Sequence, residues 1–198
     1  VGTICILDPS PRDFSAEDME LLRDLGAMVE RELAAIRLAT IDDLTGIANR
    51  RGFLTMAQHA LQFCQRQQVP ACLAFLDLNK FKYINDNYGH AEGDNALRFF
   101  AGQLRQHFRE SDLCARLGGD EFVVLLTNTD ITRANELTKR LTAALQASPL
   151  QANPEGADAV TYNLSFSHGV VEYDPLKHAS IDDLLEEGDR LMYQDKKR

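Results

Sequence analysis

The stretch Arg116-Leu117-Gly118-Gly119-Asp120-Glu121-Phe122 places two adjacent carboxylates directly after a pair of glycines. Apolar runs typical of strands flank it, at residues 113–117 and 122–126. Two glycines between such runs predict a tight hairpin turn, because hairpin turns need positive φ, which glycine adopts freely. A turn without side chains also lets backbone N–H groups approach a phosphate, and acids at its tip suit a divalent metal. On local grounds alone, a surface hairpin with solvated acids is the alternative.

The composition of the 198-residue chain is typical of one generous globular domain, or of one domain plus a fragment. Its net charge of -9 argues against a nucleic-acid partner and against direct contact with an anionic membrane, both of which favour clustered Lys and Arg. A protein of this charge that handles phosphates must neutralise them locally, most simply with Mg²⁺. No apolar run approaches the ~20 residues of a membrane span, and nothing resembles a signal peptide.

The cysteines lack the CxxC spacing of metal or redox sites and lie in apolar or amphipathic runs; they are Cys5, Cys64, Cys72 and Cys114. We interpret them as reduced packing residues of a cytoplasmic protein. Because the first residue is Val rather than Met, we expect the chain to be a piece of a longer protein.

A long helix is predicted over residues 16–40, with Ser15 as its cap and Asp18 at the capping-box position. Apolar residues at spacings of three and four give this helix one apolar face, made of Leu22, Leu25, Val29, Leu33 and Ile36. This face fits either packing onto the helix's own domain or a coiled coil between two protomers. The sequence leaves both alternatives open.

The rest of the chain alternates between helical and strand patterns. We expect helices over residues 49–67, 81–88, 91–109, 131–147 and 181–196, and strands over 71–78 and 161–171 besides the hairpin. This order predicts an α+β fold, in which helices cover a mixed, mostly antiparallel central sheet.

Asp77 ends the predicted buried strand at 71–78, and Asp120 begins the second strand of the hairpin. If these strands are neighbours, two carboxylates meet at one sheet edge, as a two-metal phosphoryl-transfer site requires. The segment between them opens with residues 77–94, Asp-Leu-Asn-Lys-Phe-Lys-Tyr-Ile-Asn-Asp-Asn-Tyr-Gly-His-Ala-Glu-Gly-Asp, which supplies lysines for phosphate and Asn and Asp for a base edge.

Together with the hairpin and the upstream stretch 43–51, Asp-Leu-Thr-Gly-Ile-Ala-Asn-Arg-Arg, this segment resembles the GGDEF family of diguanylate cyclases. The resemblance covers residues 41–198, with the three motifs in the family's order. It implies a fold like nucleotidyl cyclases and the polymerase palm. It also implies condensation of two GTP into cyclic di-GMP with release of two pyrophosphates. The alternative is a catalytically silent GGDEF-like module that binds GTP or cyclic di-GMP as an effector.

The resemblance assigns roles position by position. The Asp77 and Asp120 carboxylates and the Leu78 carbonyl would hold Mg²⁺ or Mn²⁺, two ions per active site. Asp120 would accept the proton of the 3′-hydroxyl, Glu121 would support the metal site, and Lys82 would stabilise charge in the transition state. The implied substrate-binding residues are Asn85 and Asp94, which would face guanine, His90, Lys196 at the triphosphate, and the turn glycines Gly118 and Gly119.

Arg109 and Asp112 fit the family's RxxD inhibitory site, which implies cyclic di-GMP as a feedback inhibitor as well as a product; a solvated helix end is the alternative. The activity implies a homodimer. Two departures from the family are Asn79, where many members carry Asp, and the end of the chain at Arg198, before a basic position that often helps bind the triphosphate.

Residues 1–40 resemble the C-terminal end of a GAF sensory domain plus a linker helix. Gly2-Thr3-Ile4-Cys5 would be the last strand of that domain. The predicted domains are therefore 1–40, the GAF-like fragment with the linker, and 41–198, the cyclase domain, acting as the output module of a signalling protein.

Overall fold

The computed structural model describes residues 3, 5, 13–152 and 159–197. The chain forms two compact units, residues 1–39 and 40–198. Helix α1 (Ala16–Thr40) begins as predicted, because Ser15 and Asp18 exchange hydrogen bonds in a capping box. No residue of α1 is buried, and Leu33 on its apolar face is 54% exposed. The predicted GAF-like strand Gly2–Cys5 falls in a stretch of which only Thr3 and Cys5 are described.

The second unit is built on a five-stranded sheet with the order β1-β3-β4-β2-β7. Its strands are β1 (Ala48–Asn49), β2 (Ala71–Leu78), β3 (Leu113–Gly118), β4 (Glu121–Thr127) and β7 (Phe166–Glu172). The β1–β3 pair is parallel and the other pairs are antiparallel. The predicted α+β fold with a mixed, mostly antiparallel sheet is confirmed.

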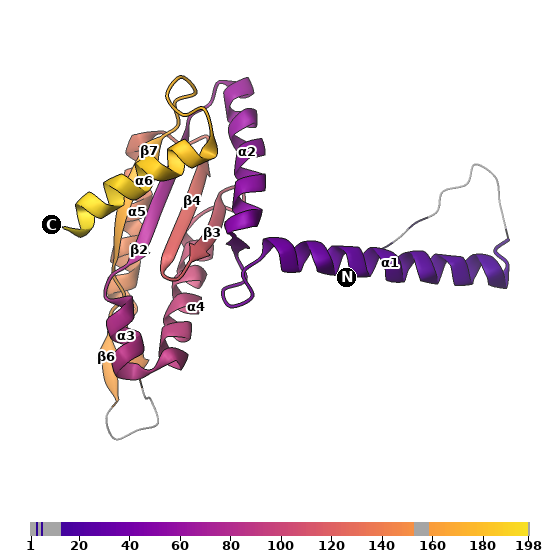
Figure 1. Ribbon diagram of the computed structural model, residues 1–198, viewed down its shortest axis with the longest axis horizontal. Helices are drawn as coiled ribbons and strands as arrows, with labels where there is room; N and C mark the ends of the chain where they lie inside the picture. The colour runs from indigo at the N-terminus through magenta and orange to yellow at the C-terminus, as the bar shows by residue number, and fades with distance from the viewer. Residues whose placement is uncertain (1–2, 4, 6–12, 153–158, 198) are drawn as a thin grey trace. The chain divides into compact units, whose positions relative to one another are not determined.

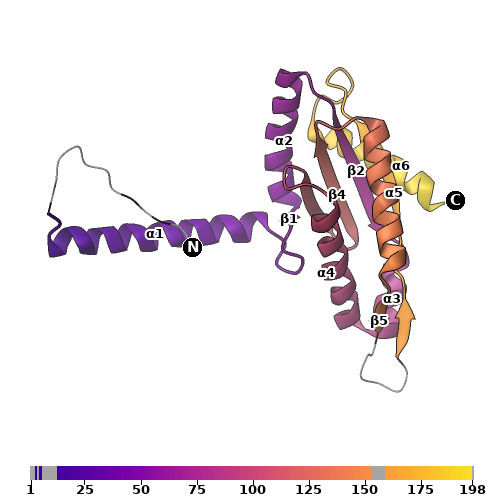
Figure 2. The same cartoon turned by 180° about the vertical axis from the view of Figure 1, so that it is seen from behind.

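Helices cover both faces of this sheet. Helices α4 (His90–His107) and α5 (Ile131–Ala147) lie on one face, and α2 (Arg50–Gln67) and α6 (Ile181–Lys196) lie on the other (Figures 1 and 2). Every residue of β2 is buried, because alternate side chains of a central strand point to opposite, covered faces. Leu76 belongs to the core under α4 and α5, whereas Leu73 and Phe75 belong to the core under α2 and α6. Because side chains alternate along a strand, Asp77 lies on the same face of β2 as Leu73 and Phe75.

The predicted single strand over 161–171 is wrong. It divides into β6 (Val160–Tyr162), which pairs with β5 (Leu150–Ala152) in a separate two-stranded sheet, and β7 in the main sheet. The chain leaves the two-stranded sheet at Asn163, whose side-chain amide donates to the carbonyl of Gln146. The next residue, Leu164, is buried in the core under α4 and α5. The alternation of polar and apolar residues continues from Thr161 to Phe166, so the sequence pattern does not mark this break.

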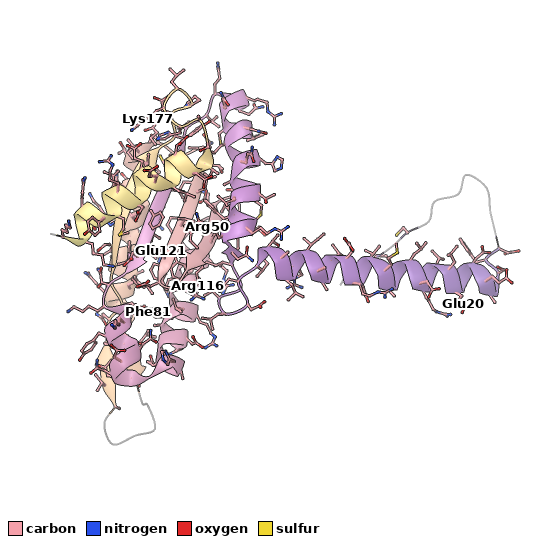
Figure 3. All side chains as sticks on the ribbon, viewed as in Figure 1. Glu20, Arg50, Phe81, Arg116, Glu121 and Lys177 are labelled. Carbon is pink, nitrogen blue, oxygen red and sulfur yellow. The ribbon has the colours of Figure 1, made fainter. Side chains whose placement is uncertain are left out.

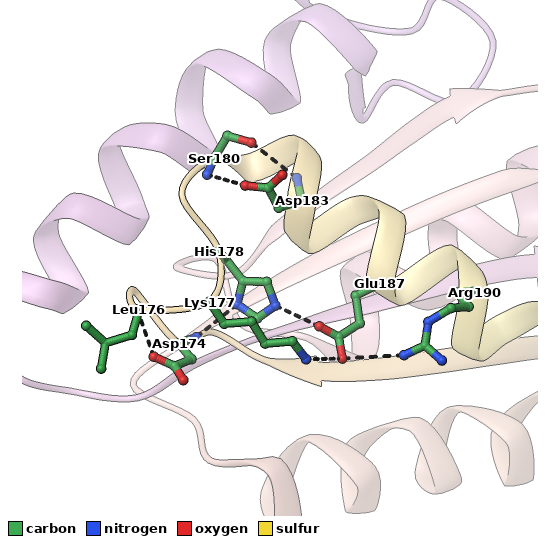
Figure 4. A network of polar contacts seen from close by, with 8 residues as sticks. All are labelled: Asp174, Leu176, Lys177, His178, Ser180, Asp183, Glu187 and Arg190. Carbon is green, nitrogen blue, oxygen red and sulfur yellow. Dashed lines mark hydrogen bonds and ion pairs between the residues drawn. The ribbon is translucent and has the colours of Figure 1, made fainter.

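Helix α6 is fixed to the domain by a polar network at its start (Figure 4). His178 is only 3% exposed; the Asp174 N–H donates to its Nδ1, so Nε2 carries the proton and donates to Glu187. Lys177 pairs with the same carboxylate, which lowers the pKa of Glu187, and Ser180 and Asp183 form a capping box. The rest of α6 is therefore held in a defined direction across the sheet.

Close backbone contact also seats α6 on β7. A side chain at Gly169 of β7 would lie 2.2 Å from the carbonyl oxygen of Gly188 in α6. Only glycine permits this approach. Over the described ranges, no helix combines the length and apolarity that crossing a membrane requires.

Candidate active site

The glycine pair forms the predicted hairpin between β3 and β4. Gly119 has φ of 52°, and the strand register shifts between Arg116 and Gly118. The Arg116 side chain donates from Nε to the carbonyl of Gly119, at 2.9 Å. This hydrogen bond joins the end of β3 to the turn that follows it. A side chain at Gly118 or Gly119 would meet nothing within 4 Å, so the turn presents open backbone.

The strand register gathers the predicted carboxylates at one end of the sheet. Asp77 of β2 lies directly opposite Glu121 of β4, and the Leu78 N–H donates to the Asp120 carbonyl at 3.1 Å. The condition set for a shared site is met, because β2, which ends at Asp77-Leu78, pairs with β4, which follows Asp120. Glu121 and Arg116 mark this end of the sheet in Figure 3. Asp77 is 7% exposed, whereas Asp120 and Glu121 are half-buried.

Negative charge accumulates here. Burial, and secondly the charge of Asp77, raise the pKa of the Asp120 carboxyl, while Lys196 and Arg116 oppose the rise. Burial, Asp189, Asp77 and Asp120 likewise raise the pKa of Glu121. The Lys196 ammonium lies 2.6 Å from Asp77 Oδ1, and this hydrogen bond raises the pKa of Lys196. The last turn of α6 thus delivers one cation to the carboxylates.

This donor set fits a hard divalent cation. Mg²⁺ is usually held by one or two carboxylates together with substrate phosphates and waters, rather than by a full cage of side chains. Asp77 and Asp120 could supply such carboxylates, and Leu78 a main-chain carbonyl at the same strand end. Among the described residues, no group of three or more His, Cys, Asp or Glu side chains forms a metal cage. Any metal at this site would therefore share its coordination with a bound phosphate.

Helices α3 (Phe81–Tyr88) and α4 carry the remaining predicted residues. Lys82 is exposed in the first turn of α3, only a few residues beyond the end of β2, and His90 is exposed at the start of α4. The half-buried Asn85 side chain lies against position 93, directly before Asp94. Asp94 is half-buried and lies 3.8 Å from Arg98.

The predicted inhibitory pair occupies the opposite end of β3. The Arg109 N–H donates to the buried Asp112 carboxylate at 3.0 Å, so Asp112 also caps its own turn. Both residues line a pocket of about 500 Å³, which Arg105, Met56 and residues 46–48 also border. Since β3 runs from Leu113 to Gly118, roughly 20 Å of strand separates this pocket from the hairpin tip.

Sequence reasoning missed two supporting residues. Asp42 accepts hydrogen bonds from the Thr45 N–H and hydroxyl, and its carboxylate lies 3.2 Å from Arg116. Ser167 of β7 donates to Asn79 Oδ1 at 2.8 Å, so the amide that stands in place of an Asp ties the end of β2 to β7. Neither contact could be read from the sequence, because the partners are 74 and 88 positions apart.

Known proteins resemble this chain throughout. The family described as diguanylate cyclase, GGDEF domain, matches residues 39–198. Diguanylate cyclase DgcP of Pseudomonas aeruginosa is 30% identical over 99% of this chain and 30% of its own length. The probable diguanylate cyclase DgcC of Escherichia coli is 32% identical over 81% of this chain and 41% of its own length. The cyclic di-GMP phosphodiesterase NbdA of P. aeruginosa is 33% identical over 81% of this chain and 20% of its own length. This chain thus spans less than half of each of these relatives.

Solved structures agree with the fold. The coiled coil and GGDEF domain of DgcB from Caulobacter crescentus, in complex with c-di-GMP, has a TM-score of 0.78 at 26% identity, over 90% of this chain and 94% of that one. The GGDEF domain of YfiN from P. aeruginosa has a TM-score of 0.71 at 35% identity, over 79% of this chain and 88% of that one.

Proposed function

Because this chain belongs to the GGDEF family of diguanylate cyclase domains, we propose that it condenses two GTP into cyclic di-GMP and releases two pyrophosphates. The observation that carries this proposal is the cross-strand pair Asp77–Glu121 beside Asp120, with the Lys196 ammonium at 2.6 Å from Asp77. A pure binding module requires neither this concentration of carboxylates nor the raised pKa of Asp120 and of Glu121. A proton-transfer and phosphoryl-transfer site does.

In the proposed reaction, the 3′-hydroxyl of one GTP attacks the α-phosphorus of the other. Asp120 accepts the hydroxyl proton, and its raised pKa brings its basicity closer to neutral pH. Lys82 and Lys196 hold the triphosphate and stabilise the charge that develops on the phosphoryl oxygens. Divalent cations held by Asp77, Asp120 and the Leu78 carbonyl would supply Lewis acidity and neutralise the phosphates. Glu121 supports that site from the neighbouring strand position.

Selection of guanine is assigned to Asn85 and Asp94. The Asp94 carboxylate can accept hydrogen bonds from guanine N1–H and from its 2-amino group, which adenine cannot match. A polar group left unpaired in this way can reject the wrong substrate by as much as ~10⁴-fold. His90 contacts the substrate from the start of α4, and the backbone of Gly118 and Gly119 approaches the phosphates.

Three regulatory features complete the proposal. The pocket of Arg109 and Asp112 binds cyclic di-GMP as a feedback inhibitor. Two protomers assemble as a homodimer, each holding one GTP. Residues 1–40 act as the end of a GAF-like sensory domain plus a linker, ahead of a catalytic domain at 41–198.

Incubation of the protein with GTP and Mg²⁺, followed by anion-exchange chromatography of the nucleotides, tests the proposed activity. We expect cyclic di-GMP and pyrophosphate in a ratio of one to two, and no product when Mg²⁺ is chelated. Binding of GTP without turnover, measured in parallel by equilibrium dialysis, would instead identify a silent effector module.

A further inference from the structure

Gly93 is buried inside helix α4, and the place where its side chain would stand is already taken by Asn85. A methyl group at position 93 would put its carbon 2.0 Å from Asn85 Oδ1, 2.9 Å from Cγ and 3.4 Å from Nδ2. All three of these atoms belong to the amide end of one side chain. Gly102 in the same helix differs, because a methyl group there would meet nothing within 4 Å.

Glycine is less favourable than alanine within a helix, so local helix stability does not explain why position 93 is a glycine. The helices cannot easily separate to admit a larger residue. Tyr88 of α3 stacks on Tyr162 of β6 with ring centroids 5.7 Å apart, and the Tyr162 hydroxyl donates to Glu92 of α4. Gly89 joins the two helices directly. An added methyl group must therefore be accommodated by movement of the Asn85 side chain, because both its Oδ1 and its Cγ lie within 3.0 Å of the added carbon.

We propose that Gly93 is a positioning residue for base recognition: the space left by its missing side chain holds the Asn85 amide in one orientation beside Asp94. This inference rests on the proposed function, since it takes guanine as the group that Asn85 reads. It predicts an unusual outcome for a buried helical glycine. Its replacement should harm nucleotide selection while leaving the fold at least as stable, because the clash falls on the movable end of a side chain.

The test compares Gly93→Ala, Asn85→Ala, the double variant and the matched control Gly102→Ala. The ligand is 3′-deoxy-GTP with Mg²⁺, which lacks the attacking hydroxyl and cannot turn over, and 3′-deoxy-ATP is the competitor base. We expect Gly93→Ala and Asn85→Ala each to weaken 3′-deoxy-GTP binding by about tenfold, as the loss of a hydrogen bond does, and to narrow the preference over 3′-deoxy-ATP. The double variant should bind no more weakly than Asn85→Ala, and Gly102→Ala should bind like wild type.

Thermal unfolding of the same four variants and of the wild type tests the packing separately from the function. Gly102→Ala should raise the unfolding temperature, as expected for a helical glycine with open space around it. Gly93→Ala should give a smaller gain in the wild-type background than in the Asn85→Ala background, where the obstructing amide is gone. Equal gains in both backgrounds, or wild-type binding and base preference in Gly93→Ala, would overturn the inference. Failure of the wild-type protein to bind 3′-deoxy-GTP would instead refute the proposed function, and the thermal comparison would still decide the packing.

Discussion

Opposing effects act on the pKa of the Asp120 carboxyl. Burial and then the charge of Asp77 raise this pKa, whereas Lys196 and Arg116 lower it, and the net pKa is raised. A carboxyl group whose pKa is raised on folding is more acidic in the unfolded chain. Ionised Asp120 therefore opposes folding at neutral pH rather than supporting it. The stability of the fold therefore does not explain an ionised carboxylate at this position.

Replacement of Asp120 by Ala should separate these two contributions. We expect loss of at least ~10³-fold in cyclic di-GMP formation, because the proposed proton acceptor and a proposed metal-binding carboxylate disappear together. The free energy of unfolding at pH 7 should be unchanged or higher. Steady-state turnover and urea unfolding measure the two quantities. Glu136→Ala, which removes an exposed carboxylate paired with Arg133 on α5, is the control and should leave both unchanged. Turnover of the Asp120→Ala variant at the wild-type rate would refute the catalytic assignment.

Arg109 lies at the far end of β3 from the carboxylates, so feedback and catalysis should be separable. Arg109→Ala should raise the concentration of cyclic di-GMP needed for half-inhibition by at least tenfold, because the guanidinium proposed to bind the guanine edge or a phosphate is lost. The initial rate should not fall. Rate measurements at increasing product concentration check this, with Arg66→Ala on the exposed surface of α2 as the control. Unchanged inhibition in Arg109→Ala would contradict the inhibitory site and show that Arg109 and Asp112 serve only as a cap at the helix end.

At the scale of elements, the ion pair between Asp42 and Arg116 connects the loop before β1 to the hairpin between β3 and β4. Burial alone would raise the pKa of Asp42, but hydrogen bonds from Thr45 and the Arg116 charge outweigh it, and the pKa of Asp42 is lowered. A carboxylate whose pKa is lowered on folding stabilises the fold fully at pH values above the ordinary carboxyl pKa of about 3.9. That stability is lost as the pH falls through the lowered value.

Asp42→Asn removes the charge and keeps an oxygen that can accept from Thr45. We expect it to reduce the free energy of unfolding by about 1 kcal/mol at pH 7, after allowance for solvent screening of a partly exposed pair. The difference from wild type should begin to shrink as the pH drops below about 4, and it should vanish below the lowered pKa of Asp42, where the wild-type carboxyl is protonated as well. Urea unfolding at pH 7 and pH 3 measures it. If this difference in the free energy of unfolding does not change with pH, the ionised Asp42 carboxylate does not stabilise the fold through its pair with Arg116.

Elements with strong local signals were predictable from the sequence. The helices at 16–40, 81–88, 131–147 and 181–196 have the predicted bounds, because each combines a capping or glycine signal with an apolar face. The hairpin followed from glycine chemistry. The approach of Asp77 to Asp120 could be stated only on the condition that their strands pair, which the register of β2 and β4 supplies. Strands β1 and β5, of two and three residues, carry too little pattern to be found, and the break between β6 and β7 depends on partners distant in the sequence. Distance along the chain also hid the Arg116–Asp42 ion pair. The Asn85–Gly93 contact joins near neighbours in the sequence, but it depends on how α3 packs against α4.

At the scale of the whole molecule, the stoichiometry of the proposed reaction demands more than one copy. One set of base-recognition residues, Asn85 and Asp94, holds one GTP, yet each of the two nucleotides must attack the other. Two domains must therefore face each other, each presenting its own Asp120. Helix α1 offers a means of pairing them, because the apolar face formed by Leu25, Val29 and Leu33 is exposed along its length.

Replacing Val29 and Leu33 with Asp should weaken this association, because each copy would bring two carboxylates into an apolar seam. We expect the dimer dissociation constant to rise at least tenfold, with activity falling most at low protein concentration. Sedimentation velocity and rate measurements over the same concentration range test both effects. Asp at Ala27 and Ala34 adds equal charge to the opposite side of the helix and is the control, expected to resemble wild type. If activity stays proportional to protein concentration where the wild type sediments as a monomer, α1 does not assemble the site, and the two nucleotides must meet within one copy.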